Sequence, residues 1–96
     1  MPLLARFKIV GHSMEPRIKT GETVLVSSIP YWFKIPKIHD IVAFKDDTNK
    51  ILIKRIIKIQ NGKYFVQGDN KNDSLDSRKF GYIPKDKIIG EIIYKL

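Results

Sequence analysis

Short hydrophobic stretches separated by polar, turn-forming residues are the dominant pattern of this chain. Rich in β-branched and aromatic residues, these stretches are bounded by turn-forming residues and are typical of β-strands. We interpret six of them as strands, at residues 7–10, 22–27, 40–45, 51–59, 63–67 and 88–94. No helical period is sustained, so we expect only single helical turns, one after Pro16 and one at residues 84–87.

Turn signals indicate how some of these strands connect. The sequence Asp-Asp-Thr-Asn at residues 46–49 predicts a hairpin between residues 40–45 and 51–59. Asn61-Gly62 predicts a second, tighter hairpin. Strands this short and numerous favour a mainly β fold, a small antiparallel and partly closed structure with at most one or two short helical turns. Without repeats or a linker, residues 1–96 are expected to form a single domain.

Two segments do not fit the strand pattern. Residues 29–38 contain Tyr31, Trp32 and Phe33 between prolines, which keep a segment out of a sheet. The segment could cap the open end of the β-structure, or it could present its aromatic rings to a lipid interface. The other is the polar loop at residues 68–81, and loops of this length in small domains are usually functional or disordered.

The composition of the chain limits its possible catalytic chemistry and its possible partners. The chain has no cysteine and two histidines, so thiol chemistry is excluded and we expect no metal or other cofactor. No run approaches the ~20 apolar residues of a membrane span, and no secretory signal is visible. The net charge of +8 favours anionic partners such as lipid headgroups. The lysines are scattered, so we expect no nucleic-acid partner, and an ordinary solvated surface is the simpler alternative.

Lys54 is the first candidate for catalysis. Alternation places it on the same strand face as Leu52 and Ile56. A lysine there either extends its amine to the rim or is desolvated, and full burial lowers a lysine pKa by up to ~3–5 units. A neutral lysine can act as a general base. Considered alone, a lysine on such a face more commonly extends its amine to the rim than loses its solvent.

Ser13 is the second candidate. It lies at a corner, where a strand ends at Gly11 and the chain turns at Pro16. A serine presented at such a corner can be a nucleophile if a base activates it. Considered alone, it more commonly caps a short turn such as residues 15–18.

Three sequence boxes change this assessment. Residues 11–16, Gly-His-Ser-Met-Glu-Pro, resemble the serine box of signal peptidase I, and residues 53–56 resemble its lysine box. Residues 68–78, GDNKNDSLDSR, resemble its GDN…S-x-D-S-R box and are followed by Gly-Tyr-Ile-Pro; residues 36–44 are similar to the strand before the lysine box. The boxes occur in the family's order across roughly residues 7–94. The chain therefore resembles the signal peptidase I family of Ser/Lys peptidases, of S26 type, in a minimal form without an anchor or second domain.

The resemblance implies a catalytic set. Ser13 falls on the nucleophile, Lys54 on the general base, and Ser74 on the serine that orients the lysine amine. The backbone N–H of Ser13 is the expected oxyanion donor. Gly11 lies where some members of the family carry a second oxyanion donor. The identity of a second donor in this chain therefore stays open.

Supporting residues follow from the same boxes. Asp69 falls where the family pairs an aspartate with the arginine after the lysine, here Arg55. Asp76 and Arg78 fall on an ion pair that braces the loop. Only residues 57–67 separate the lysine box from the GDN box, where larger bacterial enzymes insert a second β-domain.

The function that the resemblance implies is a serine endopeptidase that cleaves signal peptides or propeptides after small residues through an acyl-enzyme. The expected partners are a peptide or preprotein substrate and an anionic membrane, contacted through Tyr31, Trp32 and Phe33. The expected location is membrane-associated, with an extracytoplasmic active site.

Other functions stay open. A maturation protease dedicated to one precursor, resembling those of nickel superoxide dismutase, would be soluble and cytoplasmic. A non-catalytic LexA-like regulatory or binding module would need a tethered cleavage segment and a DNA-binding domain, which the sequence does not contain. A histidine triad of Ser13, His39 and Asp40 is disfavoured, since neighbouring residues of an extended segment point to opposite faces.

Overall fold

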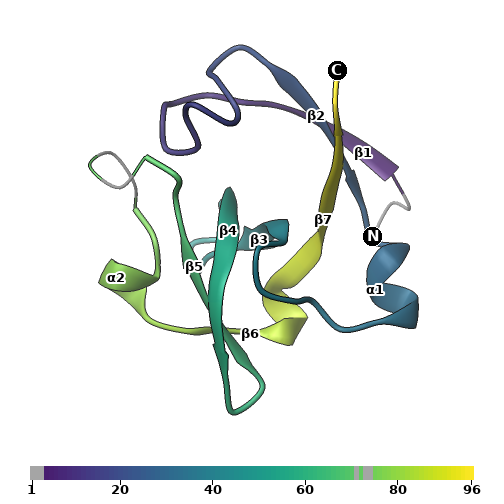
Figure 1. Cartoon of the computed structure of the whole chain (residues 1–96), viewed down its shortest axis with the longest axis vertical. Helices are drawn as coiled ribbons and strands as arrows, with labels where there is room; N and C mark the ends of the chain where they lie inside the picture. The colour runs from purple at the N-terminus through teal and green to yellow at the C-terminus, as the bar shows by residue number, and fades with distance from the viewer. Residues whose placement is uncertain (1–3, 71, 73–74) are drawn as a thin grey trace.

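A single antiparallel sheet organises the molecule (Figure 1). The computed structural model describes residues 4–70, 72 and 75–96. Its strands are β1 (Leu4–Lys8), β2 (Thr23–Ser27), β3 (Ile41–Lys45), β4 (Ile51–Gln60), β5 (Lys63–Gln67), β6 (Ile83–Pro84) and β7 (Ile88–Lys95). The helical elements in this part of the chain are α1 (Pro30–Phe33), α2 (Ser77–Phe80) and a 3-10 turn, η1 (Lys85–Lys87). The predicted fold class, mainly antiparallel β with very little helix, is confirmed.

The strand order explains the partly closed shape. The order is β1-β2-β7-β3-β4-β5-β6, so the C-terminal strand β7 lies between β2 and β3. The sheet curls but leaves β1 and β6 as its two edges (Figure 1). All pairings between β1 and β4 are antiparallel. Because three strands separate β1 from β4, these two strands run in the same direction.

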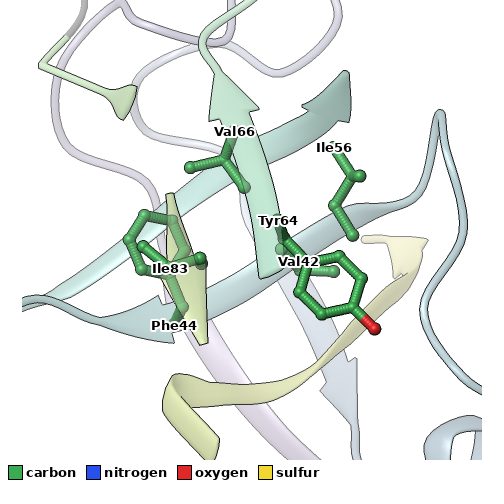
Figure 2. Close-up of a cluster of buried hydrophobic side chains, with 6 residues drawn as sticks. All are labelled: Val42, Phe44, Ile56, Tyr64, Val66 and Ile83. Carbon is green, nitrogen blue, oxygen red and sulfur yellow. The ribbon is translucent and has the colours of Figure 1, made fainter. Parts of the chain in front are cut away.

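Both faces of β3 are buried, which divides the hydrophobic core in two. Val42 and Phe44 contribute to one cluster (Figure 2), and Ala43 contributes to the other. The first cluster also contains Ile56, Tyr64, Val66 and Ile83, and the second contains Met14, Ile18, Val24 and Val26. The alternating side chains of one strand therefore fill both clusters.

The two predicted hairpins are present. β3 pairs with β4, and β4 pairs with β5 around the turn at Asn61 and Gly62. Both turn residues have positive φ, 53° and 73°, as a tight two-residue turn requires. The helical turn predicted near residue 85 is η1, and the turn after Met14 is closed by a bond from Ile18 N to Met14 O of 2.9 Å.

Three local predictions differ from the structure. The first strand spans Leu4–Lys8 rather than residues 7–10; beyond it, Ile9 still bonds with Glu22, but Val10 is 90% exposed. The helices α1 and α2 were not predicted, because one turn of helix is too short to display a period. α2 depends on a local cap, since the Asp76 carboxylate accepts a hydrogen bond from Arg78 N.

Candidate active site

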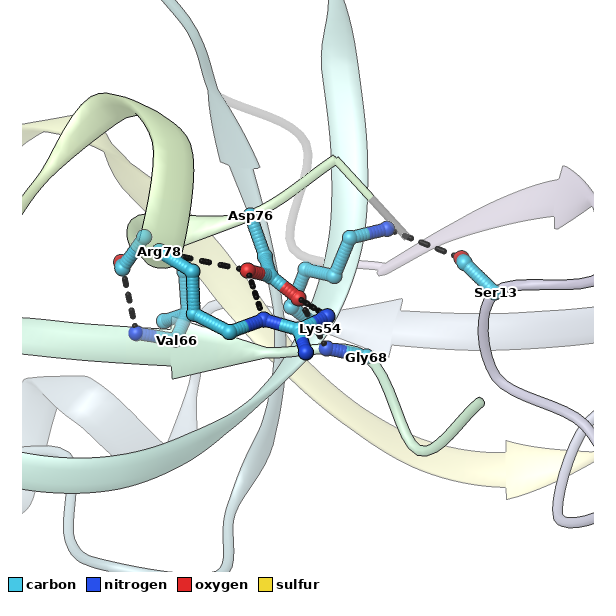
Figure 3. Close-up of polar contacts among 7 residues, drawn as sticks. Ser13, Lys54, Val66, Gly68, Asp76 and Arg78 are labelled. Atoms are coloured by element: carbon cyan, nitrogen blue, oxygen red, sulfur yellow. Dashed lines mark hydrogen bonds and ion pairs between the residues drawn. The ribbon is translucent and has the colours of Figure 1, made fainter. Parts of the chain in front are cut away.

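Ser13 and Lys54 meet although 41 residues separate them in the sequence. The Lys54 amine donates to Ser13 Oγ at 2.9 Å (Figure 3). It also donates to the carbonyl oxygen of Ile53 at 3.2 Å. Lys54 extends from the buried face of β4 and is 4% exposed, whereas Ser13 is half-buried in the loop that follows β1. The lysine is therefore desolvated and does not extend to the rim.

Burial controls the protonation of this lysine. Desolvation lowers the pKa of Lys54 below its ordinary value of 10.5. The Asp76 carboxylate acts in the opposite direction, and the positive charge of Lys50 lowers the pKa further. The net effect is a larger neutral fraction near neutral pH. A neutral amine at 2.9 Å can accept the proton of the Ser13 hydroxyl.

The serine loop is fixed by contacts on both sides of Ser13. Met14 is 2% exposed and anchors the loop in the second core cluster. The backbone N–H of Asn70 donates to Ser13 O at 2.8 Å, and the Asn70 side-chain amide donates to His12 O at 3.1 Å. Sequence reasoning assigned no role to Asn70. Its place in the GDN box was the available signal.

Asp76 is a buried residue that accepts several hydrogen bonds within the loop that follows β5. Its side chain is fully buried, and Oδ2 accepts from Gly68 N and Arg78 Nη2, both at 3.0 Å (Figure 3). Oδ1 accepts from Arg78 N at 3.1 Å and from Arg78 Nε at 2.9 Å. The neighbouring Ser77 Oγ accepts from Val66 N at 2.8 Å. The carboxylate therefore ties α2 to the end of β5, beside Lys54.

The pair of Arg55 and Asp69 forms a second brace. Arg55 Nε and Nη2 donate to the two Asp69 oxygens at 2.9 and 2.8 Å, and Arg55 Nη1 donates to His39 O at 3.1 Å. The hydrogen bonds to Asp69 raise the pKa of the Arg55 guanidinium, so the guanidinium stays charged. This bidentate pair holds the start of the polar loop against β4.

One predicted residue has no structural description. Ser74 lies outside the described residues, so its role as orienter stays a prediction. The Ser13 backbone N–H meets no hydrogen-bond acceptor among the residues that are described.

Asp40 of the alternative triad has other partners, and so does His12, the histidine next to Ser13. Asp40 Oδ2 accepts from the Tyr31 hydroxyl at 2.8 Å and from Lys37 N at 3.1 Å. His12 Nδ1 contacts Glu15 Oε2 at 2.8 Å. The basic side chain on Ser13 Oγ is Lys54, not a histidine.

The aromatic segment divides its side chains between the core and the surface. Tyr31 turns inward and packs against the first core cluster, and burial together with the bond to Asp40 raises its pKa. Trp32 and Phe33, the next residues of α1, are exposed. Within residues 4–70, 72 and 75–96, no helix is long and apolar enough to span a membrane, and no group of metal-binding side chains is found.

A cleft of about 660 Å³ leads to the Ser13 hydroxyl and the Lys54 amine. Two segments, residues 7–14 and 50–54, form its walls together with Leu75. Among the described residues, each wall has a strand edge without a pairing partner: β1 pairs only with β2, and β5 pairs with β4 only from Arg55 onward. The cleft is thus a gap in the curled sheet where one more strand could pair.

Comparison with known proteins identifies relatives over nearly the whole chain. The profile of the family "Signal peptidase, peptidase S26" matches residues 1–60 and 58–96. Signal peptidase I V of Bacillus subtilis is 29% identical, with 90% of this chain and 82% of the relative covered. Signal peptidase I of Buchnera aphidicola is 36% identical over 86% of this chain and 28% of the relative. Thylakoidal processing peptidase 1 of Arabidopsis thaliana is 25% identical over 91% of this chain and 40% of the relative.

The comparisons also locate a difference in length. The match to the Bacillus protein extends over 137 residues, whereas this chain has 96. The two matches to the family profile meet at residues 58–60, directly before the hairpin turn between β4 and β5. The relative therefore has internal residues without a counterpart here, and this hairpin is where the two family matches join.

Proposed function

The chain belongs to the signal peptidase family, peptidase S26, and is a serine endopeptidase; we propose that Ser13 is its nucleophile and Lys54 its general base. The observation that carries this proposal is the 2.9 Å contact between the Ser13 hydroxyl and the amine of Lys54, a residue that is 4% exposed. A free serine is a weak nucleophile, and a desolvated amine within hydrogen-bond distance supplies the base that it needs.

The proposed reaction has two steps. Neutral Lys54 accepts the hydroxyl proton as Ser13 Oγ attacks the scissile carbonyl, and the resulting ammonium returns this proton to the leaving amine. The first product leaves and the acyl group stays on Ser13. Lys54 then takes a proton from water, whose oxygen attacks the ester, and the proton returns to Ser13 Oγ as the acid is released. The Ser13 N–H is the proposed donor to the oxyanion.

The substrate is proposed to bind as an extended strand between the two walls of the cleft. β1 and β4 run in the same direction, and residues 7–13 and 50–54 lead toward Ser13 and Lys54. A peptide parallel to both would place the residues before its scissile bond in the cleft and its carbonyl at the dyad. We propose signal peptides or propeptides with small residues before that bond as the substrate class.

Two side-chain deletions test this proposal. Ser13→Ala and Lys54→Ala should each abolish cleavage of a peptide with an Ala-x-Ala site, while the circular dichroism spectrum stays unchanged. Lys58→Ala is the matched control, since Lys58 is an exposed lysine of the same strand. Unchanged activity in either dyad variant would exclude the assignment.

A dedicated maturation protease is the second candidate. The short hairpin between β4 and β5 favours it, because the missing internal residues leave a smaller surface for substrate contact. Cleavage of general Ala-x-Ala peptides would support a signal peptidase. Cleavage of one precursor alone would support the maturation protease.

We also propose peripheral contact with anionic membranes through the outer face of α1 and the residues after it. Trp32, Phe33 and Ile35 are 59%, 84% and 63% exposed. Lys34 and Lys37 lie among them and are exposed as well. Aromatic rings and lysines in one surface suit the headgroup region of a lipid bilayer.

A further inference from the structure

The charge in the cleft has one sign. Lys8 lies on one wall, Lys50 on the opposite wall and Lys54 at the inner end, whereas neither Asp nor Glu is among the described lining residues. His12 also lines the cleft, and its ring contacts Glu15 outside the lining. A cleft with charges of one sign attracts ligands of the opposite sign and excludes like charges.

The two outer lysines lie at the same end of the cleft. Lys50 precedes Lys54 by four residues, and alternation directs both to the same face, so roughly 13 Å separates them along the strand. Lys8 precedes Ser13 by five residues. Because β1 runs in the same direction as β4, Lys8 and Lys50 face the same portion of a bound peptide, on its two sides.

Both ammonium groups are available to a ligand. Lys8 and Lys50 are exposed, and no ion pair among the described residues includes either of them. Asp46 lies in the hairpin before Lys50, and hydrogen bonds within the turn, together with the positive charge of Lys50, lower the pKa of its carboxyl. Its Oδ1 accepts from the N–H and hydroxyl of Thr48 and from Lys50 N, which commits that oxygen to the turn.

We propose that Lys8 and Lys50 form a specificity site for an acidic side chain about four residues before the scissile bond. This inference rests on the proposed function and narrows its substrate class. The favoured substrate is a precursor whose cleavage segment carries Asp or Glu at that position and small residues next to the bond. A cleavage segment without acidic residues leaves both lysines without a partner.

Matched peptides test the site. They share one sequence with an Ala-x-Ala site and differ only in Glu, Gln or Lys at the fourth position before the bond. We expect kcat/KM to be about fivefold higher for Glu than for Gln at low ionic strength, and the ratio should approach one in about 0.5 M salt. When the Glu is moved through the five positions on each side of the scissile bond, kcat/KM should be highest with Glu at the fourth position before the bond. Equal rates for the Glu and Gln peptides would overturn the specificity site and leave the proteolytic function standing.

Variants identify the residues responsible. Lys50→Gln and Lys8→Gln should each lower the ratio of Glu to Gln rates, and the double variant should bring it to one. Lys85→Gln, an exposed lysine outside the cleft, changes the net charge equally and should keep the ratio. Both peptides use the same dyad, so any effect of Lys50 on the Lys54 pKa cancels in the ratio. An unchanged ratio in the double variant would contradict the proposal.

A binding measurement tests the specificity site independently of catalysis. Titration of the Ser13→Ala protein with the same peptides should show tighter binding of the Glu peptide than of the Gln peptide. If wild type cleaves neither peptide but the Ser13→Ala protein keeps this preference, the proposed function fails and the cationic site stands. Equal binding of the two peptides would count against the site.

Discussion

The amine of Lys54 lies 2.9 Å from the hydroxyl oxygen of Ser13, in a position where the lysine is 4% exposed. Two strands that are distant in sequence create this contact, because β4 buries the lysine and the loop after β1 brings the serine to it. The contact unites the proposed nucleophile and the proposed base without any histidine, which distinguishes it from Ser-His-Asp triads.

The pH dependence of cleavage should follow the neutral form of Lys54. Because burial lowers its pKa, kcat/KM should rise with pH and level off through an inflection below 10.5. Lys50→Gln removes a positive charge that contributes to this lowering, so the inflection should move to higher pH. Rate profiles of wild type, Lys50→Gln and the control Lys85→Gln measure this. An inflection at the ordinary lysine value in wild type would contradict a desolvated base.

Replacement of the base should stabilise the fold. The folded-state pKa of Lys54 is lowered, so the unfolded chain binds more protons between the folded and unfolded pKa values, and stability rises with pH across that window. Below the folded pKa the fold carries the full cost of a buried ammonium. Lys54→Met removes this cost at similar volume, and we expect a melting temperature several degrees higher near neutral pH. The gain should shrink as the pH approaches 10.5, and a lower melting temperature at neutral pH would contradict the explanation.

Loss of the Asp76 carboxylate should destabilise the protein more than loss of Asp69. Asp76 is fully buried and accepts from Gly68 and Arg78, whereas the Asp69 side chain is 19% exposed. Removal of the Asp76 carboxylate leaves the buried Gly68 N–H without this acceptor and breaks the contact with Arg78, so we expect the larger loss of stability for Asp76→Ala. Urea unfolding of Asp76→Ala and Asp69→Ala measures both changes. Equal losses would show that burial of the Asp76 carboxylate is not the reason for its effect.

Membrane contact can be followed with Trp32, because it is the only tryptophan of the chain. Vesicles rich in phosphatidylglycerol should shift its emission to shorter wavelength as the ring enters the headgroup region, and phosphatidylcholine vesicles should do so much less. Phe33→Ser should weaken the shift, whereas Phe65→Ser, on β5, provides a control outside this surface. The same shift with both lipids would argue against an electrostatic contribution, and no shift with either would refute the membrane contact.

The sequence predicted the strands better than it predicted local geometry. The hydrophobic runs of β3 and β4, bounded by turn residues, were sufficient to predict both strands, because β3 has apolar side chains on both faces and each face packs into one core cluster. The burial of Lys54 was not predictable from its strand, since a lysine on an apolar face can also extend to the rim. That outcome depends on the serine loop and Asp76, which pack around the amine from distant parts of the chain.

The two short helices α1 and α2 were not predictable from the sequence for a different reason. α1 and α2 are four residues each and contain no periodic pattern; the first begins at a proline and the second at a capping aspartate. Asn70 was also missed as a support for Ser13. Its two contacts, with Ser13 O and His12 O, join loops that only the tertiary structure brings together.

Direct detection of the acyl-enzyme tests the central claim. The protein would be mixed with a peptide ester that ends in an Ala-x-Ala acyl group, quenched in acid within the first turnover and analysed by intact mass spectrometry and peptide mapping. We expect one acyl adduct on Ser13, absent from Ser13→Ala and formed far more slowly by Lys54→Met at neutral pH. An adduct on another residue, or peptide hydrolysis by the Ser13→Ala protein at the wild-type rate, would contradict the assignment of Ser13 and Lys54 as nucleophile and base.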